Sequence, residues 1–331
     1  MKSIIKLSTL ALLILMANFS LALSWQAQCP DVMERGHLNV LTINVLFSEV
    51  EKREDRLTII ADFMEEQEQE GEPIDLVLLQ EVVGGPLSGT VNSALDLKNL
   101  LAERALEYNL SYRLANGVPK IFMVGNAILS RCKILFTISK TLPFVTEEPF
   151  EGFEIPLRRK VMMSRVRIPG FGKINVYNTH LCAFCAPIAE RLKQAKVLMD
   201  FIEDVEDFIW WDKNPVILGG DFNANLNNLG DIFVYALITH GGFIDTYATH
   251  NDCFSCCIEE QERFDGCTWG VPGNPYAFNP FTWQREEAKR IDYIFIKGKR
   301  IRTQESFVVF NSDLYWVSDH SGVLTRIGLL P

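Results

Sequence analysis

The sequence predicts an α/β protein in which two packed β-sheets are covered by helices on their outer faces. Short apolar segments rich in β-branched residues recur along the whole chain, and segments with helical periodicity separate the early ones. The later apolar segments are joined by long loops. Strands that alternate with helices and then continue through loops fit two sheets packed face to face, with the helices outside.

The individual elements are predicted from these patterns. We expect strands at 37–45, 75–82, 126–130, 161–168, 173–181, 216–219, 291–297, 306–310 and 322–327. We expect helices at 53–66, 94–108 and 188–210. In the last of these, apolar residues recur every three or four positions, so each helix has one face to bury.

The first 24 residues have the composition of a signal peptide. Lys2 and Lys6 give a basic start, an uncharged apolar run follows at 7–16, and small residues precede a cut between Ser24 and Trp25. A spanning helix needs about 20 apolar residues, roughly twice the length of this run. We therefore expect export to a periplasmic or extracellular compartment, with an uncleaved anchor as the alternative. No later stretch is long and apolar enough to span a bilayer.

Residues 25–331 are expected to form one domain, because the chain has no repeats and no low-complexity linker. An insertion at about 251–283 differs in composition, with four cysteines, Gly/Pro turns and several aromatic residues. Loops of this length are usually functional or disordered, and the cysteines argue against disorder. The aromatic residues are expected either to form a local core stapled by disulfides or to contact a membrane interface. They are Phe254, Phe264, Trp269, Tyr276, Phe278, Phe281 and Trp283.

The cysteine count favours disulfides. All eight cysteines follow the expected cut, and an even number in an exported chain is typical of a disulfide framework whose pairing the sequence leaves open. The alternative is a zinc site that joins Cys182 and Cys185 to Cys253 and Cys256.

The formal net charge of −10 argues mildly against a protein that binds long stretches of nucleic-acid backbone. Two basic strips could act locally, one formed by residues 158–160 with Arg165 and Arg167, the other by residues 297–302. Solvated surface charge is the simpler interpretation of both strips.

Polar side chains cluster at the ends of apolar strands. Glu81 ends one such strand, His180 ends another, and Asp221 follows a third with Asn223 two positions later. Residues two apart on an extended chain share a face, so Asp221 and Asn223 are expected to reach one ligand together. Asp292 opens a further apolar strand.

These clusters occur in a recognisable order. Six segments carry the pattern: Leu41-Thr42-Ile43-Asn44, Leu79-Gln80-Glu81-Val82, Asn178-Thr179-His180-Leu181, Gly220-Asp221-Phe222-Asn223, Arg290-Ile291-Asp292-Tyr293 and Ser318-Asp319-His320. Over roughly residues 37–328 the chain resembles the endonuclease/exonuclease/phosphatase superfamily, and within it the neutral sphingomyelinase-like branch. The resemblance implies a four-layer α-β-β-α sandwich of two mixed sheets and a metal-dependent phosphoester hydrolase.

The resemblance also implies roles for these residues. Asn44, Glu81 and Asp319 would hold the metal, and their oxygen ligands suit Mg²⁺, with Mn²⁺ as the alternative. His320 would be the general base and Asp292 would fix its tautomer. Asp221 would align the attacking water or the metal shell, Asn223 would donate to a phosphoryl oxygen, and His180 would be a cationic donor or a leaving-group acid.

The expected substrate is a phosphodiester, with a choline-type phospholipid at a membrane surface favoured over DNA. Export, the acidic balance and the stretch from Cys267 to Tyr276, which is similar to the segment preceding the same motif in neutral sphingomyelinases, favour the lipid. A secreted deoxyribonuclease-like enzyme acting on nucleic acid is the main alternative, followed by a phosphoinositide phosphatase. A non-enzymatic binding module is disfavoured because every expected polar side chain is present.

Overall fold

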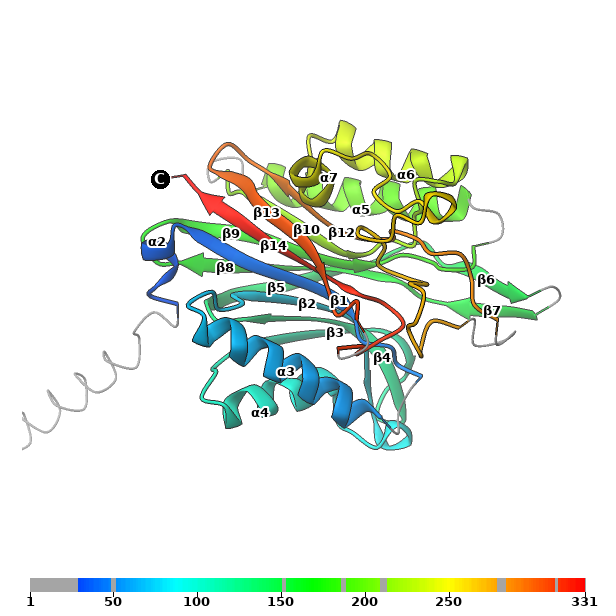
Figure 1. Ribbon diagram of the computed structural model, residues 1–331, viewed down its shortest axis with the longest axis horizontal. Helices are drawn as coiled ribbons and strands as arrows, with labels where there is room; N and C mark the ends of the chain where they lie inside the picture. Colours follow the sequence, from blue (N-terminus) through cyan, green and yellow to red (C-terminus); the bar gives the residue numbers. More distant parts are fainter. Residues whose placement is uncertain are drawn as a thin grey trace, which may run out of the picture.

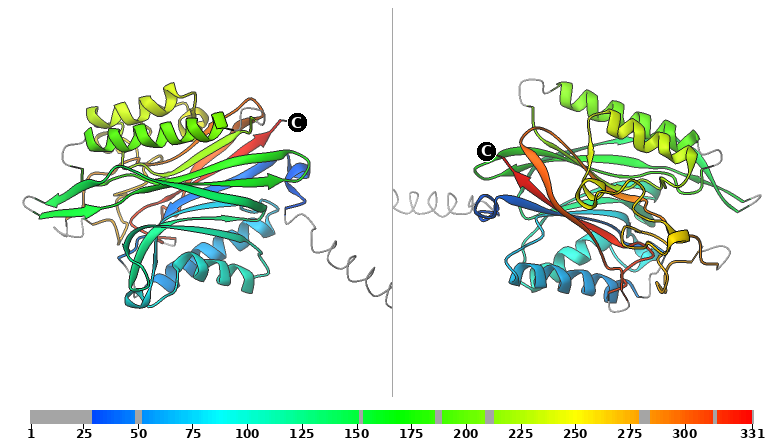
Figure 2. Two further views of the ribbon diagram at one scale, coloured as in Figure 1. Left: turned by 180° about the vertical axis from the view of Figure 1, so that it is seen from behind. Right: turned by 45° about the horizontal axis from the view of Figure 1, so that its top comes forward.

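The computed structural model describes residues 29–48, 52–150, 153–185, 189–208, 213–278, 284–312 and 315–330. Two six-stranded sheets pack face to face, and helices cover the outer face of each (Figures 1 and 2). The predicted four-layer α-β-β-α sandwich is therefore confirmed. The expected signal peptide at 1–24 lies outside the described residues.

The first sheet has the strand order β13-β14-β1-β2-β4-β3. Its strands are β1 (His37–Asn44), β2 (Leu76–Gly84), β3 (Asn109–Val118), β4 (Phe122–Ser130), β13 (Ile301–Val309) and β14 (Gly322–Leu329). β1 and β2 run parallel, and the other neighbours are antiparallel, so the sheet is mixed.

The second sheet has the order β11-β12-β10-β9-β8-β5. Its strands are β5 (Lys133–Thr141), β8 (Lys160–Ile168), β9 (Gly172–His180), β10 (Val216–Asp221), β11 (Ile244–Asp245) and β12 (Asp292–Lys297). β9 and β10 are its parallel pair. A separate hairpin of β6 (Val145–Phe150) and β7 (Phe153–Leu157) projects beyond the sheets (Figure 1).

The helices divide between the two outer faces. α3 (Arg53–Gln69) and α4 (Ser93–Glu103) cover the first sheet, and α5 (Ala189–Phe208) and α6 (Leu229–His240) cover the second (Figure 2). α7 (Thr246–Asn251) lies against β13 of the first sheet and β12 of the second. The short elements α2 (Val32–Arg35), η1 (Pro86–Ser88) and η2 (Glu259–Gln261) complete the set. None of the described helices is both long and apolar enough to cross a membrane.

Alternation along the strands builds the core in three parts. In β1, Leu38 and Val40 pack between the sheets, whereas Leu41 and Ile43 pack beneath the helices of the first sheet. A third apolar cluster lies between the second sheet and its helices. Because successive strand residues point to opposite faces, a central strand such as β1 contributes apolar residues to the core on both sides.

Several elements differ from the sequence-based expectations. The second predicted helix ends at Glu103 and not at 108, because Ala105 adopts a left-handed φ of 60° that a helix cannot continue. β13 begins at Ile301, five residues before the predicted start. β3 and β5 were not predicted, since these edge strands alternate partly exposed residues and lack a continuous apolar run.

All eight cysteines pair in four disulfides, which join Cys29 to Cys132, Cys182 to Cys185, Cys253 to Cys256 and Cys257 to Cys267. The prediction of a disulfide framework is confirmed. The alternative zinc site is wrong, because each of its Cys-x-x-Cys segments closes on itself.

The Cys29–Cys132 disulfide should contribute most to stability, because it closes a sequence separation of 103 residues. Replacing both cysteines by serine should lower the free energy of unfolding by about 4–5 kcal/mol on the loop-entropy model. The matched control is the Cys253→Ser/Cys256→Ser pair, whose separation of 3 residues predicts a smaller loss. Denaturant unfolding of both variants measures the difference, and equal losses would contradict the loop-length argument.

Candidate active site

His180, Asp221 and Asp292 lie side by side on three neighbouring strands. Asp221 of β10 pairs with His180 of β9 on one side and with Asp292 of β12 on the other. Residues paired across strands place their side chains on the same face. Here that face is packed against the first sheet, because Ile217 and Ile294 share it in the core between the sheets.

Asn44 reaches the same seam from the first sheet. It is the last residue of β1, and its Nδ2 donates to Asp221 Oδ2 at 3.0 Å and lies 3.5 Å from His320 Nε2. A second polar contact lies nearby, where Gln80 Nε2 donates to Asn178 Oδ1 at 2.8 Å. Hydrogen bonds between the two sheets therefore replace apolar packing at this end of the seam.

His320 and Asp292 form a buried pair. The Nδ1 atom of His320 is 2.8 Å from Asp292 Oδ2, and its Nε2 atom is 3.7 Å from Asp221 Oδ2. His320 is 5% exposed and both carboxylates are buried. The dyad that the sequence predicted is thus present in the geometry, and Asp221 lies at its other nitrogen.

The carboxylates decide the protonation of His320. Burial alone would lower the pKa of His320, but Asp292, Asp221 and Asp319 raise it well above its usual value. Burial, followed by the charge of Asp292, raises the pKa of Asp221 to about 7. In the metal-free site these carboxyl groups therefore favour the protonated form of His320.

His180 has the opposite electrostatic environment. Its Nε2 lies 3.3 Å from Asp221 Oδ2 and 3.0 Å from the Nη1 atom of Arg159. Burial, followed by the charges of Arg159 and His320, lowers the pKa of His180 well below its usual value. Arg159 thus supplies a positive charge beside the imidazole. The role of His180 as a cationic donor or a leaving-group acid stays a prediction.

Glu81 occupies a β-bulge in β2. Its φ is 57°, and the register of β2 against β4 shifts between Leu79 and Val82. The strand continues to Gly84, so Glu81 does not end it as the sequence suggested. Bulges beside active sites redirect side chains, and here the Glu81 carboxylate accepts the Phe47 N–H at 2.9 Å.

Glu81 also faces a second carboxylate. Burial, followed by the charge of Asp319, raises the pKa of Glu81, and a hydrogen bond from Asn44 opposes this rise. Two carboxylates and an amide thus converge beside the His320 pair, and these oxygen donors suit a hard cation such as Mg²⁺. A second group of acidic and histidine side chains, Asp221 with Asp292 and His320, has ligand atoms within 4.8 Å of one another. His320 already offsets the negative charge of Asp221 and Asp292. The group formed by Glu81, Asp319 and Asn44 therefore fits a metal ion better.

Asn223 lies beyond the end of β10. Its φ of 50° shows that the chain is not extended there, so the expected sharing of a strand face with Asp221 does not apply. The two residues still meet, because the Asn223 N–H donates to Asp221 Oδ1 at 2.9 Å. The Asn223 side chain donates to the Leu181 carbonyl at 3.1 Å.

The cysteine-rich insertion positions the loop that carries Asp319 and His320. Thr268 Oγ1 accepts the Asp292 N–H at 3.1 Å, Trp269 Nε1 donates to Asp319 at 3.4 Å, and Asn274 Nδ2 donates to the Ser318 carbonyl at 2.9 Å. Sequence reasoning did not assign these positioning roles. The sequence feature that could have indicated these roles is the position of the three residues in the stretch from Cys267 to Tyr276, which precedes the Asp292 motif.

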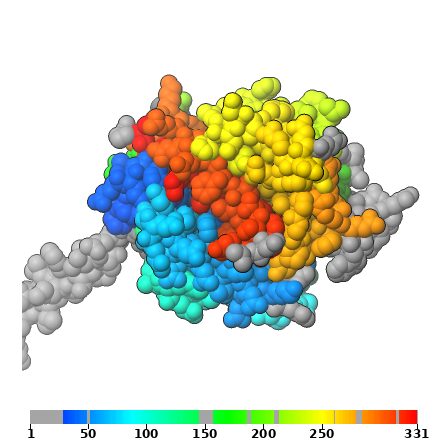
Figure 3. Space-filling view, in the orientation of Figure 1, coloured from blue at the N-terminus to red at the C-terminus, as the bar shows by residue number. Residues whose placement is uncertain are grey.

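Some aromatic residues of the insertion form the expected local core, whereas others are exposed. Phe264 and Tyr276 pack on a small core beside the Cys257–Cys267 disulfide, and Trp269 is partly buried. Phe254 and Phe278 are exposed, while Phe281 and Trp283 lie outside the described residues. In the space-filling view the insertion (yellow to orange) covers the surface beside the catalytic C-terminal segment (red), as Figure 3 shows.

Two arginines were also missed. Arg159 belongs to a basic strip that the sequence suggested to be solvated charge, yet it contacts His180. Arg56 of α3 is buried, and its Nη1 donates to the carbonyls of Val45 and Val317 at 2.7 Å each. It thereby ties the loop after Asn44 to the loop before His320.

Comparison with known proteins decides the family. The model of the endonuclease/exonuclease/phosphatase family matches residues 41–320. The chain belongs to this family. Members of the endonuclease/exonuclease/phosphatase family are generally phosphoester hydrolases that depend on a divalent metal, which identifies the chain as a hydrolase of the phosphoester or nuclease type.

Solved structures of this family share the fold. A family protein from Leptotrichia buccalis is 22% identical with a TM-score of 0.60, over 88% of this chain and 99% of that chain. An endonuclease/exonuclease/phosphatase from Beutenbergia cavernae is 20% identical with a TM-score of 0.60, over 89% and 72%. The human nocturnin catalytic domain, solved with a bound sulfate anion, is 15% identical with a TM-score of 0.57, over 89% and 95%. No curated protein matches the chain, and closeness to the sphingomyelinase-like branch stays a prediction.

The raised pKa of His320 gives a test in the metal-free protein. Asp292→Asn should lower that pKa, because Asp292 contributes more than either other carboxylate. NMR titration of the five histidines measures the change. Since the folded-state pKa is raised, protonated His320 stabilises the fold fully below about pH 6.5 and loses this effect as the pH rises through the folded-state pKa.

Asp292→Asn should therefore move this loss of stability to lower pH. Asp319→Asn is the control, and it should shift the His320 pKa less than Asp292→Asn. A His320 titration that Asp292→Asn leaves unchanged would show that the pair does not set the protonation of His320.

Proposed function

We propose that this protein is an exported Mg²⁺-dependent phosphodiesterase that hydrolyses a lipid head group. The observation that supports the reaction is the meeting of His320, Asp292 and Asp221 with Asn44 across the seam of the two sheets. An imidazole whose Nδ1 is fixed by a carboxylate keeps its Nε2 free for proton transfer. That arrangement suits activation of a water for attack on phosphorus.

In this mechanism His320 takes the proton of the attacking water at Nε2. Asp292 accepts the Nδ1–H, holds this tautomer and raises the basicity of the ring. Asp221 aligns the water, because its carboxylate lies 3.7 Å from the same Nε2 atom. Because the three residues would act as one catalytic unit, the effects of mutating them are expected to be non-additive.

His180 and Asn223 act on the phosphate. His180 is a neutral hydrogen-bond donor next to Arg159, and their combined field stabilises negative charge on the phosphoryl oxygens. The Asn223 backbone N–H donates to Asp221 Oδ1. Its side-chain amide, which donates one N–H to the Leu181 carbonyl, would donate the other to a phosphoryl oxygen.

Glu81, Asp319 and Asn44 would hold the Mg²⁺ ion. Burial, followed by the charge of Asp319, raises the pKa of Glu81 in the absence of a cation. When bound, the ion supplies charge stabilisation for the phosphate and offsets the negative charge that raises the pKa of His320.

Export is supported by the cysteines. Four disulfides in one chain are typical of an oxidising compartment. The basic and apolar start of the sequence adds to this argument.

A lipid substrate is supported by an apolar rim beside the Glu81 end of the site. The rim consists of Phe47, Leu87, Val91, Val118 and Ile121, whose side chains are between 39% and 75% exposed. The Leu87 N–H donates to the Ile121 carbonyl at 3.1 Å, and Phe47 bonds to Glu81 through its N–H. The Ile121 N–H donates to the Val118 carbonyl at 3.0 Å, and the ring of Phe122, the residue after Ile121, lies 6.4 Å from the Phe47 ring between centroids. These contacts bring Leu87, Val118 and Ile121 towards Phe47 and Glu81.

A membrane surface fits this rim better than a protein partner does. Exposed apolar groups beside the candidate site, with Lys120 directly preceding Ile121 in the chain, match the mixed apolar and anionic character of a bilayer interface. The rim replaces Trp269 as the main candidate for membrane contact, because Trp269 is partly buried and its Nε1 donates to Asp319.

Glu81→Gln tests the reaction and the metal. The variant should keep the fold and lose more than about 100-fold in activity on bis(p-nitrophenyl) phosphate, because loss of an outer-shell partner alone typically costs about 10- to 100-fold. Initial rates over a Mg²⁺ titration measure this. Glu206→Gln is the matched control, since Glu206 is a half-buried carboxylate bonded to Tyr177 and Asn175, away from the site. A Glu81→Gln variant with the wild-type rate, or full turnover of the wild type in EDTA, would contradict the mechanism.

Leu87→Gln/Val91→Gln tests the substrate. The double variant should hydrolyse phospholipid vesicles at least about ten-fold more slowly, because each side chain loses roughly 1.5 kcal/mol of apolar burial. Its rate on soluble bis(p-nitrophenyl) phosphate should match the wild type.

Phe208→Gln is the control for this experiment, because Phe208 is 78% exposed at the far end of the 20-residue helix α5. Equal loss on both substrates would indicate a structural role for the rim. Plasmid nicking by the wild type without release of any head group would favour the nucleic-acid alternative.

A further inference from the structure

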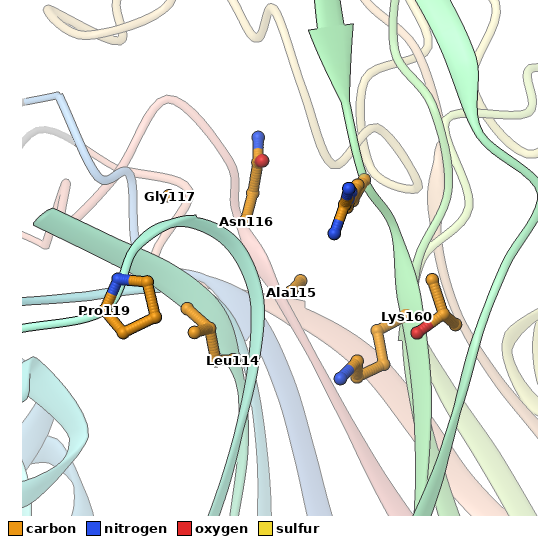
Figure 4. Close-up of a pocket in the computed structure, with 8 residues that line it drawn as sticks. Leu114, Ala115, Asn116, Gly117, Pro119 and Lys160 are labelled. Atoms are coloured by element: carbon orange, nitrogen blue, oxygen red, sulfur yellow. The ribbon is translucent and has the colours of Figure 1, made fainter.

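A cavity of about 490 Å³ lies beside the active site, between the β3–β4 hairpin and the start of β8. Leu114, Ala115 and Pro119 line the cavity from the hairpin, and Lys160 lies opposite them (Figure 4). Arg158 also lines the cavity. Lys160 projects from its strand toward the hairpin. None of the described residues that line the cavity is acidic.

The cavity is continuous with the catalytic residues. Lys160 pairs with His180 across β8 and β9, so both side chains lie on the face toward the first sheet. Arg159, between the two lining cations, contacts His180 directly. Asn126 Nδ2 donates to the Lys160 carbonyl at 2.9 Å and fixes the strand at this point. The cavity therefore adjoins the proposed phosphate site at His180 and Arg159.

The two cations face the cavity without a described counter-ion. No ion pair joins Arg158 or Lys160 to an acidic residue in the part of the chain that the structure describes. Burial, followed by the charge of nearby Arg113, lowers the pKa of Lys160. Like charges with no acid beside them repel each other, and an anion between them would relieve that repulsion.

We propose that this cavity binds a second phosphate group of the substrate, an inference that rests on the phosphodiesterase function above. The cationic wall receives the phosphate, and Leu114 and Pro119 contact the ring that carries it. A phosphate paired with such cations is bound by charge-assisted hydrogen bonds. A quaternary ammonium group would be repelled by the same wall. The structure therefore favours a phosphorylated head group over the choline-type head group that the sequence suggested.

The test measures binding in EDTA, so that it does not depend on turnover. Isothermal titration calorimetry compares two probe pairs: inositol bisphosphate against inositol monophosphate, and thymidine 3′,5′-bisphosphate against thymidine 5′-monophosphate. In at least one pair the wild type should bind the bisphosphate about ten-fold or more tightly, because a hydrogen bond to a charged group contributes roughly 1.5–3 kcal/mol. The inositol pair reports a lipid-type head group and the thymidine pair a nucleic-acid backbone.

Lys160→Gln and Arg158→Gln should each bring that affinity ratio towards one. Lys299→Gln, an exposed lysine in the turn between β12 and β13, should keep the wild-type ratio. Arg158 is exposed, so its variant tests the cavity even if Lys160→Gln lowers the melting temperature. A wild-type ratio near one in both pairs, or a ratio that both variants retain, overturns the proposal. Absence of phosphodiester hydrolysis with Mg²⁺ would instead overturn the proposed function and leave the binding result to stand.

Discussion

Two buried carboxylates face each other on neighbouring strands, and the rest of the site depends on how their repulsion is relieved. Asp221 and Asp292 are register partners in the second sheet. Water is excluded there, so the pair is tolerated only with compensating hydrogen bonds and charge. His320 and Asn44 provide both, and each comes from the first sheet or the loop that leads to it. Folding of the site is therefore inseparable from packing of the two sheets.

This dependence explains why the positioning contacts converge on loops. Arg56 ties the loop after Asn44 to the loop before His320, while Thr268 and Trp269 hold Asp292 and Asp319. A histidine between two carboxylates is useful only within tenths of an ångström, and loops alone do not supply that precision. The insertion supports Asp292 and the loop that carries Asp319, and its two disulfides restrict the movement of the insertion.

The sequence predicts the layers and most of the polar residues, because apolar strands that end in acids and histidines are visible in one dimension. Edge strands such as β5 were missed, since alternating exposed residues give little apolar signal. The role of Arg159 was missed for a different reason: a basic residue in a loop looks solvated until the fold places it against His180. Asn223 shows the same limit, because its left-handed φ is a property of the turn and not of the extended pattern around it.

The bulge in β2 has a consequence for how this strand can change in length. Leu79 and Val82 both pack beneath the helices, although three positions separate them, so Gln80 and Glu81 are consecutive residues on the side toward the seam. Deleting one residue there would restore strict alternation and heal the ladder with β4. The repaired strand would be more regular, but its one remaining polar position could not serve both the contact to Asn178 and the carboxylate beside Asp319. An irregularity of a single residue in the hydrogen-bond ladder is thus what allows one strand to bind the other sheet and to contribute to the chemistry.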